Sequence, residues 1–159
     1  MALMQFFEEI ALDELIDLTA RKHADGYRFV QTLCVNTDQG IDLIYTFNKG
    51  EAMENFTIKG VDTKTQSVPS VTGYYLSAFP FENEAHDLFG VNVTDIAIDF
   101  AGNFYAVAMD TPMTVISPEQ KAAREKVAKI AAAKAAKAAK DAAKAAQAAA
   151  SDASQKGGE

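Results

Sequence analysis

The densest group of polar side chains in the sequence lies between residues 79 and 90, which read Phe-Pro-Phe-Glu-Asn-Glu-Ala-His-Asp-Leu-Phe-Gly. On a helix, Glu82 and His86 are four positions apart and share one face. A carboxylate there could hold an imidazole, or the two groups could begin a metal site. The same spacing places Asn83 and Asp87 together on the neighbouring face.

Neither kind of chemistry finds further support along the chain. A catalytic zinc site needs a third protein ligand, and the only other imidazole belongs to His23. General acid–base catalysis by Glu82, Glu84 or Asp87 lacks an accompanying nucleophile, oxyanion motif or glycine-rich phosphate loop. A metal-dependent hydrolase that uses Glu82, Asp87 and the neighbouring imidazole is therefore the lowest-ranked alternative.

A single cysteine, Cys34, limits the cofactors that this chain can bind. Four ligands for a structural zinc or an iron–sulfur cluster cannot be collected from Cys34 and two histidines. We therefore expect no cofactor. Because no base accompanies Cys34 in a recognisable pattern, we expect it to be a small residue of the core or of a strand face rather than a nucleophile.

The segments before this polar group predict one helix and a meander of strands. Residues 4–22 place apolar side chains three and four positions apart with acids between them, which predicts an amphipathic helix. Residues 27–36 and 41–48 alternate in polarity around a short turn and predict an antiparallel hairpin. Residues 54–59 predict a third strand.

The following segments predict a second helix and more strands. Residues 71–76 are expected to be extended, and residues 80–89, followed by Gly90, predict a short helix that begins with a proline. Residues 91–100 and 103–109 predict further short strands. The fold class that results is α+β, with an antiparallel sheet and helices on one of its faces.

The composition changes after residue 118. Residues 1–118 hold six bases and seventeen acids, a net charge of −11, whereas residues 119–159 hold nine bases and five acids, a net charge of +4. Alanine and lysine dominate the second part, and both favour helices. We therefore divide the chain into an α+β domain, residues 1–118, and an alanine- and lysine-rich helical or disordered tail, residues 119–159. The tail leaves open an alternative function, nucleic-acid binding through lysines, although its first interpretation is a solvated extension.

The amino-terminal residues predict the location of the protein. The first fifteen residues contain several acids and no basic region before an apolar run, so they are not typical of a secretory signal. No stretch of about 20 apolar residues is present to span a membrane. We expect a soluble, cytoplasmic protein.

Two short motifs occur together in the middle of the chain. The first is Val68-Pro69-Ser70-Val71-Thr72, and the second, after Ala78-Phe79, is Glu82-x-Glu84-x-His86-Asp87-Leu88-Phe89-Gly90-Val91. Together they resemble the signature of the 30 kDa subunit of respiratory complex I, with both halves at the family's separation. The resemblance covers about residues 5–100, and the order of helix and strands before the motifs agrees with it.

Departures from that signature indicate a particular branch of the family. Complex I members usually place Arg where this chain has Asn83, and they continue with a Gly-His-Pro that is absent here. The phrase Ala-Phe-Pro-Phe-Glu-Asn-Glu-x-His-Asp-Leu-Phe-Gly-Val is more similar to the small soluble subunit of Ech-type, energy-converting, membrane-bound nickel–iron hydrogenases. The corresponding subunits of a complex I-like NADH:quinone oxidoreductase and of formate hydrogenlyase are the alternatives.

The resemblance implies a non-catalytic role. It implies a cofactor-free accessory protein that packs on the large nickel–iron subunit beside iron–sulfur subunits, at the cytoplasmic face of the membrane. That complex exchanges electrons between ferredoxin and protons and couples this reaction to ion translocation. Residue by residue, the resemblance makes five side chains candidate partner contacts, with no catalytic or metal-binding residue: Glu82, Glu84, His86, Asp87 and Phe89.

Overall fold

A computed structural model describes residues 4–115, 126 and 129–130 of the chain. The chain divides into two units, Met1–Val115 and Ile116–Glu159. In the second unit the described residues Lys126, Lys129 and Ile130 are helical, and the rest of the expected tail lies outside the described residues. The domain boundary after residue 118 stays a prediction. Among the described residues, no helix has the length and apolar character needed to cross a membrane.

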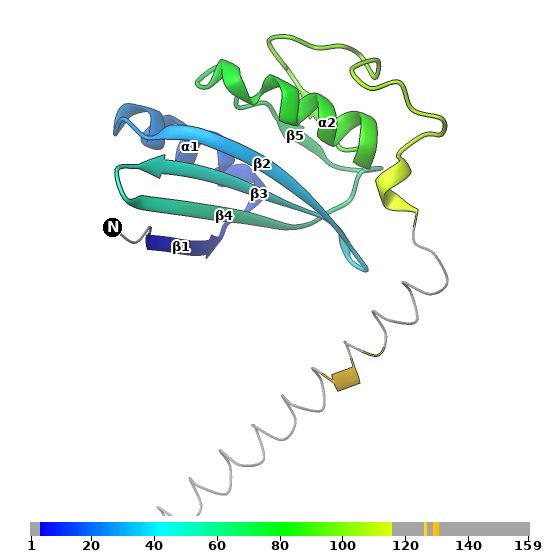
Figure 1. Ribbon diagram of the computed structural model, residues 1–159, viewed down its shortest axis with the longest axis horizontal. Helices are drawn as coiled ribbons and strands as arrows, with labels where there is room; N and C mark the ends of the chain where they lie inside the picture. Colours follow the sequence, from blue (N-terminus) through cyan, green and yellow to red (C-terminus); the bar gives the residue numbers. More distant parts are fainter. Residues whose placement is uncertain (1–3, 116–125, 127–128, 131–159) are drawn as a thin grey trace, which may run out of the picture. The chain divides into compact units, whose positions relative to one another are not determined.

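The first unit is built on a four-stranded sheet in the order β1-β4-β3-β2 (Figure 1). The strands are β1 (Met4–Glu9), β2 (Arg28–Thr37), β3 (Gly40–Lys49) and β4 (Ala52–Val61). The antiparallel pairs β2–β3 and β3–β4 confirm the predicted meander.

The prediction of a helix over residues 4–22 is wrong in its first part. Met4–Glu9 forms β1, which pairs in parallel with β4 from Met4 opposite Ala52 to Glu9 opposite Thr57. The 3₁₀ turn η1 (Leu12–Glu14) and helix α1 (Leu15–Ala24) follow. Adjacent aromatic residues suit a strand, and backbone pairing with β4 outweighs the local helical spacing. The sheet is consequently mixed rather than antiparallel.

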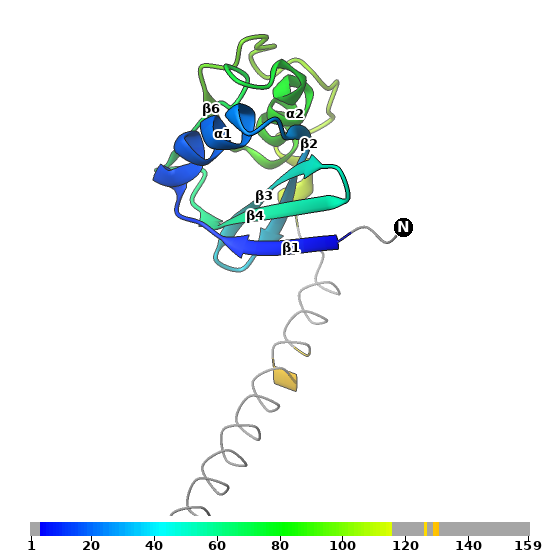
Figure 2. The same cartoon turned by 90° about the vertical axis from the view of Figure 1, so that its left-hand side faces the viewer.

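Helix α1 and helix α2 (Phe79–Phe89) lie on the same side of the sheet in both views (Figures 1 and 2). Apolar side chains of the central strands β3 and β4 form one core with Leu15 and Leu18 of α1. Aromatic rings extend this core toward α2, since Phe29 contacts both Phe47 and Phe81 at ring-centroid distances of 6.0 and 5.8 Å. Burial of these apolar side chains stabilises the packing of α2 on the sheet.

Two other predictions after the meander are corrected by the structure. Residues 71–76 are not a strand: residues 71–75 form a turn, in which the N–H groups of Tyr74 and Tyr75 donate to the Val71 carbonyl, and Leu76 begins the 3₁₀ turn η2 (Leu76–Ala78). The extended residues there are β5 (Ser67–Pro69), which pairs in parallel with β6 (Asn92–Thr94).

After β6 the chain does not form the expected strands of residues 96–100 and 103–109. Residues 95–115, which we call the long loop, are irregular except for the 3₁₀ turn η3 (Pro112–Thr114). All the described non-glycine residues with positive φ in the first unit lie in this loop: Asp95, Ala101 and Thr111. Such left-handed residues interrupt an extended strand.

Candidate partner-docking site on helix α2

Helix α2 forms where the sequence predicts a helix. Pro80 lies in its first turn, where the missing N–H costs nothing. Gly90 ends the helix with φ of 72°, and its N–H donates to the His86 carbonyl at 2.9 Å. A left-handed glycine at this position is a common helix stop. The five candidate contact residues therefore lie on one short, well-bounded helix.

Glu82 points from α2 into the molecule and is 1% exposed. Its Oε1 accepts the Val71 N–H at 2.7 Å, and its Oε2 accepts the Ser70 hydroxyl at 2.5 Å. Burial raises the pKa of Glu82 above its usual value, although the hydrogen bonds from Ser70 and Val71 oppose the shift. The carboxylate thus joins α2 to the turn at residues 70–72.

The same turn is also hydrogen-bonded to the start of the long loop. The Thr72 N–H donates to the Ser70 hydroxyl oxygen at 3.0 Å, and Thr72 Oγ1 accepts the Ala97 N–H at 2.9 Å. Glu82, Ser70, Thr72 and Ala97 form one connected series. The two halves of the sequence motif, residues 68–72 and residues 82–91, therefore meet through one buried and one partly buried hydrogen bond.

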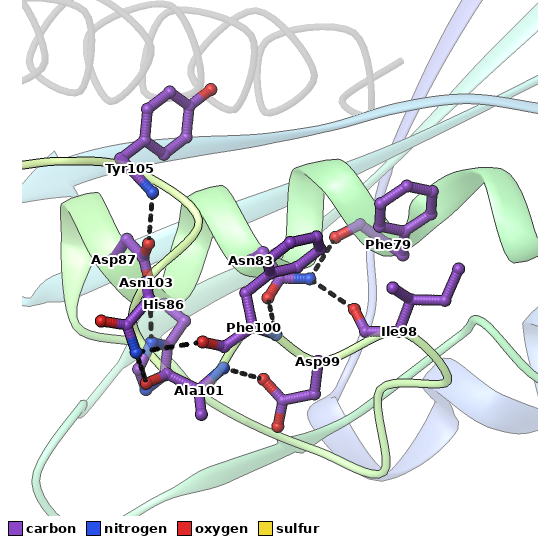
Figure 3. A network of polar contacts seen from close by, with 10 residues as sticks. All are labelled: Phe79, Asn83, His86, Asp87, Ile98, Asp99, Phe100, Ala101, Asn103 and Tyr105. Carbon is purple, nitrogen blue, oxygen red and sulfur yellow. Dashed lines mark hydrogen bonds and ion pairs between the residues drawn. The ribbon is translucent and has the colours of Figure 1, made fainter.

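Asn83 holds the first part of the long loop (Figure 3). Its side-chain amide donates to the carbonyls of Phe79 at 2.7 Å and Ile98 at 2.9 Å, and its oxygen accepts the Phe100 N–H at 2.9 Å. The residue is 1% exposed, so these three hydrogen bonds replace its contact with water. Sequence reasoning assigned Asn83 to the face of Asp87 but gave it no role.

Asp87 holds the next part of the same loop. Its Oδ2 accepts the Tyr105 N–H at 2.8 Å, and its Oδ1 lies 3.0 Å from Nδ1 of His86. Burial raises the pKa of Asp87, but the hydrogen bonds from His86 and from the backbone N–H groups of Tyr105 and Phe104 lower it more, so the pKa ends below its usual value. These hydrogen bonds therefore favour the ionised form of the Asp87 carboxyl group.

The outer side of α2 contacts the loop through side chains that are more exposed than Asn83 and Asp87. The Tyr105 hydroxyl donates to Glu84 Oε2 at 2.9 Å, and this hydrogen bond raises the pKa of Tyr105. The His86 side chain is 44% exposed, and Gly102 lies against it, since a Cβ on that glycine would be 3.3 Å from the imidazole. A small cavity of about 270 Å³ lies beside His86 and Asp87, between the end of α2 and the long loop.

The long loop presents an apolar surface to solvent. Its far end is fixed to β2, because the Asn36 side-chain amide donates to the Thr114 carbonyl at 3.0 Å. Buried or partly buried side chains thus hold a loop whose own large apolar side chains point outward. The exposed ones are Ile98, Phe100, Tyr105, Val107, Met109, Met113 and Val115.

A comparison with protein families identifies the kind of subunit. The model of the family described as "Respiratory-chain NADH dehydrogenase, 30 Kd subunit" matches residues 7–97, more than half of the chain. The chain belongs to this family. Its members are non-catalytic subunits of oxidoreductase complexes.

A solved structure supports the fold of this 30 kDa-family chain. It is a chain of the membrane-bound sulfane sulfur reductase, an archaeal respiratory membrane complex, and it matches with a TM-score of 0.50 and 22% sequence identity. The match covers 74% of the present chain and 68% of the other. A comparison with curated protein sequences gives no significant match.

The structure separates the five candidate contacts of this 30 kDa-family member into two groups. Glu82 and Asp87 are buried and have hydrogen-bond partners within the chain. The His86 side chain is well exposed, while Glu84 and Phe89 are partly exposed. A contact role for these residues stays a prediction, and Asn83 and Tyr105 join them as residues that shape the same surface.

The contacts of Glu82, His86 and Cys34 give no support to a metal site or a nucleophile among the described residues. Glu82 and His86 do not bond to each other, since Glu82 bonds the 70–72 turn and His86 lies beside Asp87. Among the described residues, no three side chains of the His, Cys, Asp and Glu types lie together as metal ligands. Cys34 is half-buried against the core, as expected, and burial together with the charge of Glu84 raises its pKa to about 12.

Proposed function

We propose that this chain is the cofactor-free accessory subunit of a membrane-bound, energy-converting nickel–iron hydrogenase. Such a complex couples ferredoxin-dependent hydrogen turnover to ion translocation. In this proposal the chain packs on the large catalytic subunit, next to the iron–sulfur subunits, at the cytoplasmic face of the membrane. Membership of the 30 kDa-subunit family supports the accessory role.

The observation that carries the docking part of the proposal is the long loop itself. Its exposed apolar side chains sit on a backbone that Asn83 and Asp87 hold in place. Large apolar patches on a fixed surface are typical of protein interfaces, because little conformational entropy is then lost on binding. Left-handed φ values at Ala101 and Thr111 agree with a loop whose shape is imposed for a function.

The contact residues have distinct parts in this proposal. Glu84, His86 and Phe89 reach the partner together with the apolar side chains of the long loop. Glu82 and Asp87 hold that surface from behind, as their burial and internal hydrogen bonds favour. A carboxylate such as Glu84 that loses water at the interface needs a basic or N–H partner opposite it.

Asn83 is the residue in α2 at which this chain departs from the usual complex I signature. Complex I members resemble this chain but usually have Arg at this position. An arginine has no acceptor atom and cannot accept the Phe100 N–H as Asn83 does. The path of the long loop in this chain therefore depends on the residue by which it departs from the complex I signature. The corresponding subunits of a complex I-like oxidoreductase or formate hydrogenlyase are the alternatives.

Affinity purification of the tagged full chain from its native cells in mild detergent, with nickel and iron measured, tests the proposal. We expect a nickel–iron large subunit and membrane subunits in stoichiometric amounts. Val107→Asp, on the long loop, should reduce the recovered nickel at least tenfold. Val35→Asp on β2 is a matched control, because both valines are 39% exposed, and it should leave the nickel unchanged.

Three results would contradict the proposal. Recovery of iron without nickel, together with quinone-reacting subunits, would assign the chain to a complex I-like enzyme. Recovery of the chain alone or with nucleic acid would reject the accessory role. Equal loss of nickel in both valine variants would reject the long loop as the docking surface.

A further inference from the structure

Strand β1 forms an edge of the sheet (Figure 2). It pairs with β4 on one side, and no described residue pairs with its other side. We propose that this outer edge binds an extended, basic segment of a partner protein as an added strand. The residues involved are separate from α2 and the long loop, so this proposal is independent of the proposed function.

The backbone of β1 shows which groups are available. The Met4 N–H donates to the Glu51 carbonyl at 2.9 Å, and the Ile10 N–H donates to the Thr57 carbonyl at 3.0 Å. Backbone groups alternate in direction along a strand, so the even-numbered residues bond to β4. The N–H and C=O groups of Gln5, Phe7 and Glu9 consequently point to the free edge, where an added strand would pair with them.

The first four residues of β1, Met4 to Phe7, leave this edge without a charged side chain. Exposed edge strands usually carry lysine, proline or a bulge that prevents pairing with other chains. The sequence of β1, Met-Gln-Phe-Phe-Glu-Glu, has none of these, and its pairing with β4 is regular. Phe6 is 52% exposed and Phe7 is 72% exposed, on opposite faces of the strand. An added strand with apolar side chains on one face would cover one of these two rings.

Charge identifies the chemistry of the partner. Glu8 and Glu9 end the strand and line a groove of about 380 Å³ between β1, β4 and α1. Lys22 in this groove is already paired with Glu54. The groove contains two bases, Arg21 and Lys22, against five acids, which are Glu8, Glu9, Glu14, Asp25 and Glu54.

The same charges disfavour a second copy of the chain at this edge. Residues 1–118 carry a net charge of −11, so two such domains repel each other at moderate ionic strength. An extended segment with lysine or arginine is instead attracted to Glu8 and Glu9. The occupant that fits is therefore a basic strand with alternate apolar residues.

Amide hydrogen exchange of the full chain, resolved by residue with NMR, tests this assignment. The probe is the synthetic peptide Thr-Lys-Val-Lys-Val-Lys-Val-Thr, and the control peptide has Glu in place of each Lys. We expect the lysine peptide to slow the exchange of the Gln5, Phe7 and Glu9 amides at least tenfold. The amides of Phe6 and Glu8, which already bond to β4, should change little, and the glutamate peptide should have no effect.

Two variants at Phe7 distinguish the contribution of its backbone N–H to peptide affinity from that of its side chain. Phe7→Pro removes an outward N–H that β4 does not use, so the sheet should remain folded while peptide affinity falls at least tenfold. Phe7→Thr keeps the N–H and should lose less affinity. If Phe7→Pro fails to fold, the Glu8→Lys/Glu9→Lys variant provides the second test, because it should reverse the preference toward the glutamate peptide.

Each opposite result overturns the proposal. Unchanged exchange of the three outward amides with the lysine peptide would show that the edge does not accept a strand. Equal protection by both peptides would show that the edge does not select a basic segment. Concentration-dependent protection without peptide, with a dimer mass in sedimentation, would assign the edge to a second copy of the chain.

Discussion

Glu82 and Asp87 lie five positions apart on helix α2, and both are almost inaccessible to solvent, but their surroundings shift their pKa values in opposite directions. Glu82 faces the 70–72 turn, where burial dominates and raises its pKa. Asp87 faces the long loop, where hydrogen bonds from His86 and the backbone outweigh burial and lower its pKa. The surroundings of Glu82 therefore disfavour its ionised form, whereas those of Asp87 favour it.

The difference separates a structural region from a surface-forming region. The Glu82 region joins segments inside the core, so its contacts determine whether α2 is fixed to the domain. The Asp87 region, with Asn83, holds a loop that is otherwise open to solvent. We therefore expect changes near Glu82 to affect global stability most, and changes near Asp87 to affect mainly the shape of the docking surface.

The largest effect is expected from Glu82→Ala. The substitution leaves the buried Val71 N–H without its acceptor and opens space in the core. The free energy of unfolding, measured by urea denaturation, should fall by about 3 kcal/mol. Glu84→Ala is the control on the same helix and should cost less than about 0.5 kcal/mol. Similar losses in both variants would contradict the structural role of Glu82.

A smaller effect is expected from Asp87→Ala. The Tyr105 N–H loses its acceptor, but water can reach the loop and replace part of the hydrogen bond. The free energy of unfolding should fall by about 1.5 kcal/mol, while the Tyr105 amide exchanges at least tenfold faster in NMR. If the loss of stability equals that of Glu82→Ala, the distinction between the two regions fails.

The smallest effect is the pH dependence of stability, which should have opposite signs at the two sites. The pKa of Glu82 in the folded state is above its usual value of 4.5, so stability falls as pH rises from 4.5 through the folded-state pKa. The pKa of Asp87 is below its usual value of 3.8, so its stabilisation is complete above 3.8 and is lost as pH falls through the folded-state pKa.

Urea unfolding between about pH 2 and pH 7 measures both effects. Relative to the unmodified chain, Glu82→Gln should remove the decline above pH 4.5, and Asp87→Asn should reduce the loss below pH 3.8. Changes of the same sign in both variants would show that burial, rather than hydrogen bonding, also dominates at Asp87.

Local sequence signals were sufficient for part of the fold. The β2–β3 hairpin and α2 have strong signals, namely alternating polarity around a short turn and a proline-to-glycine boundary. Strand β1 was missed because its apolar spacing also fits a helix, and its pairing with β4 involves residues almost fifty positions away. The long loop was predicted as strands because its apolar residues are those of a strand, although they are exposed.

The candidate site was predictable in location but not in its internal contacts. The motif identified α2 and the 68–72 segment, but the Glu82 bonds to Ser70 and Val71 depend on three-dimensional folding. The role of Asn83 was also hidden, because an asparagine in a helix gives no signal for which backbone groups it will bond. Its burial between Glu82 and Glu84 became evident only in the structure, and a buried amide must have hydrogen-bond partners.

The most direct test of the central claim is amide hydrogen exchange of residues 98–115 in the free chain and in the complex purified from native cells. We predict that the long-loop amides that are not bonded within the chain exchange at least tenfold more slowly in the complex. The amides of residues 70–72, Phe100 and Tyr105, already bonded within the chain, should change little. Equal exchange of the long loop in the two states would contradict the claim that α2 and this loop form the docking surface.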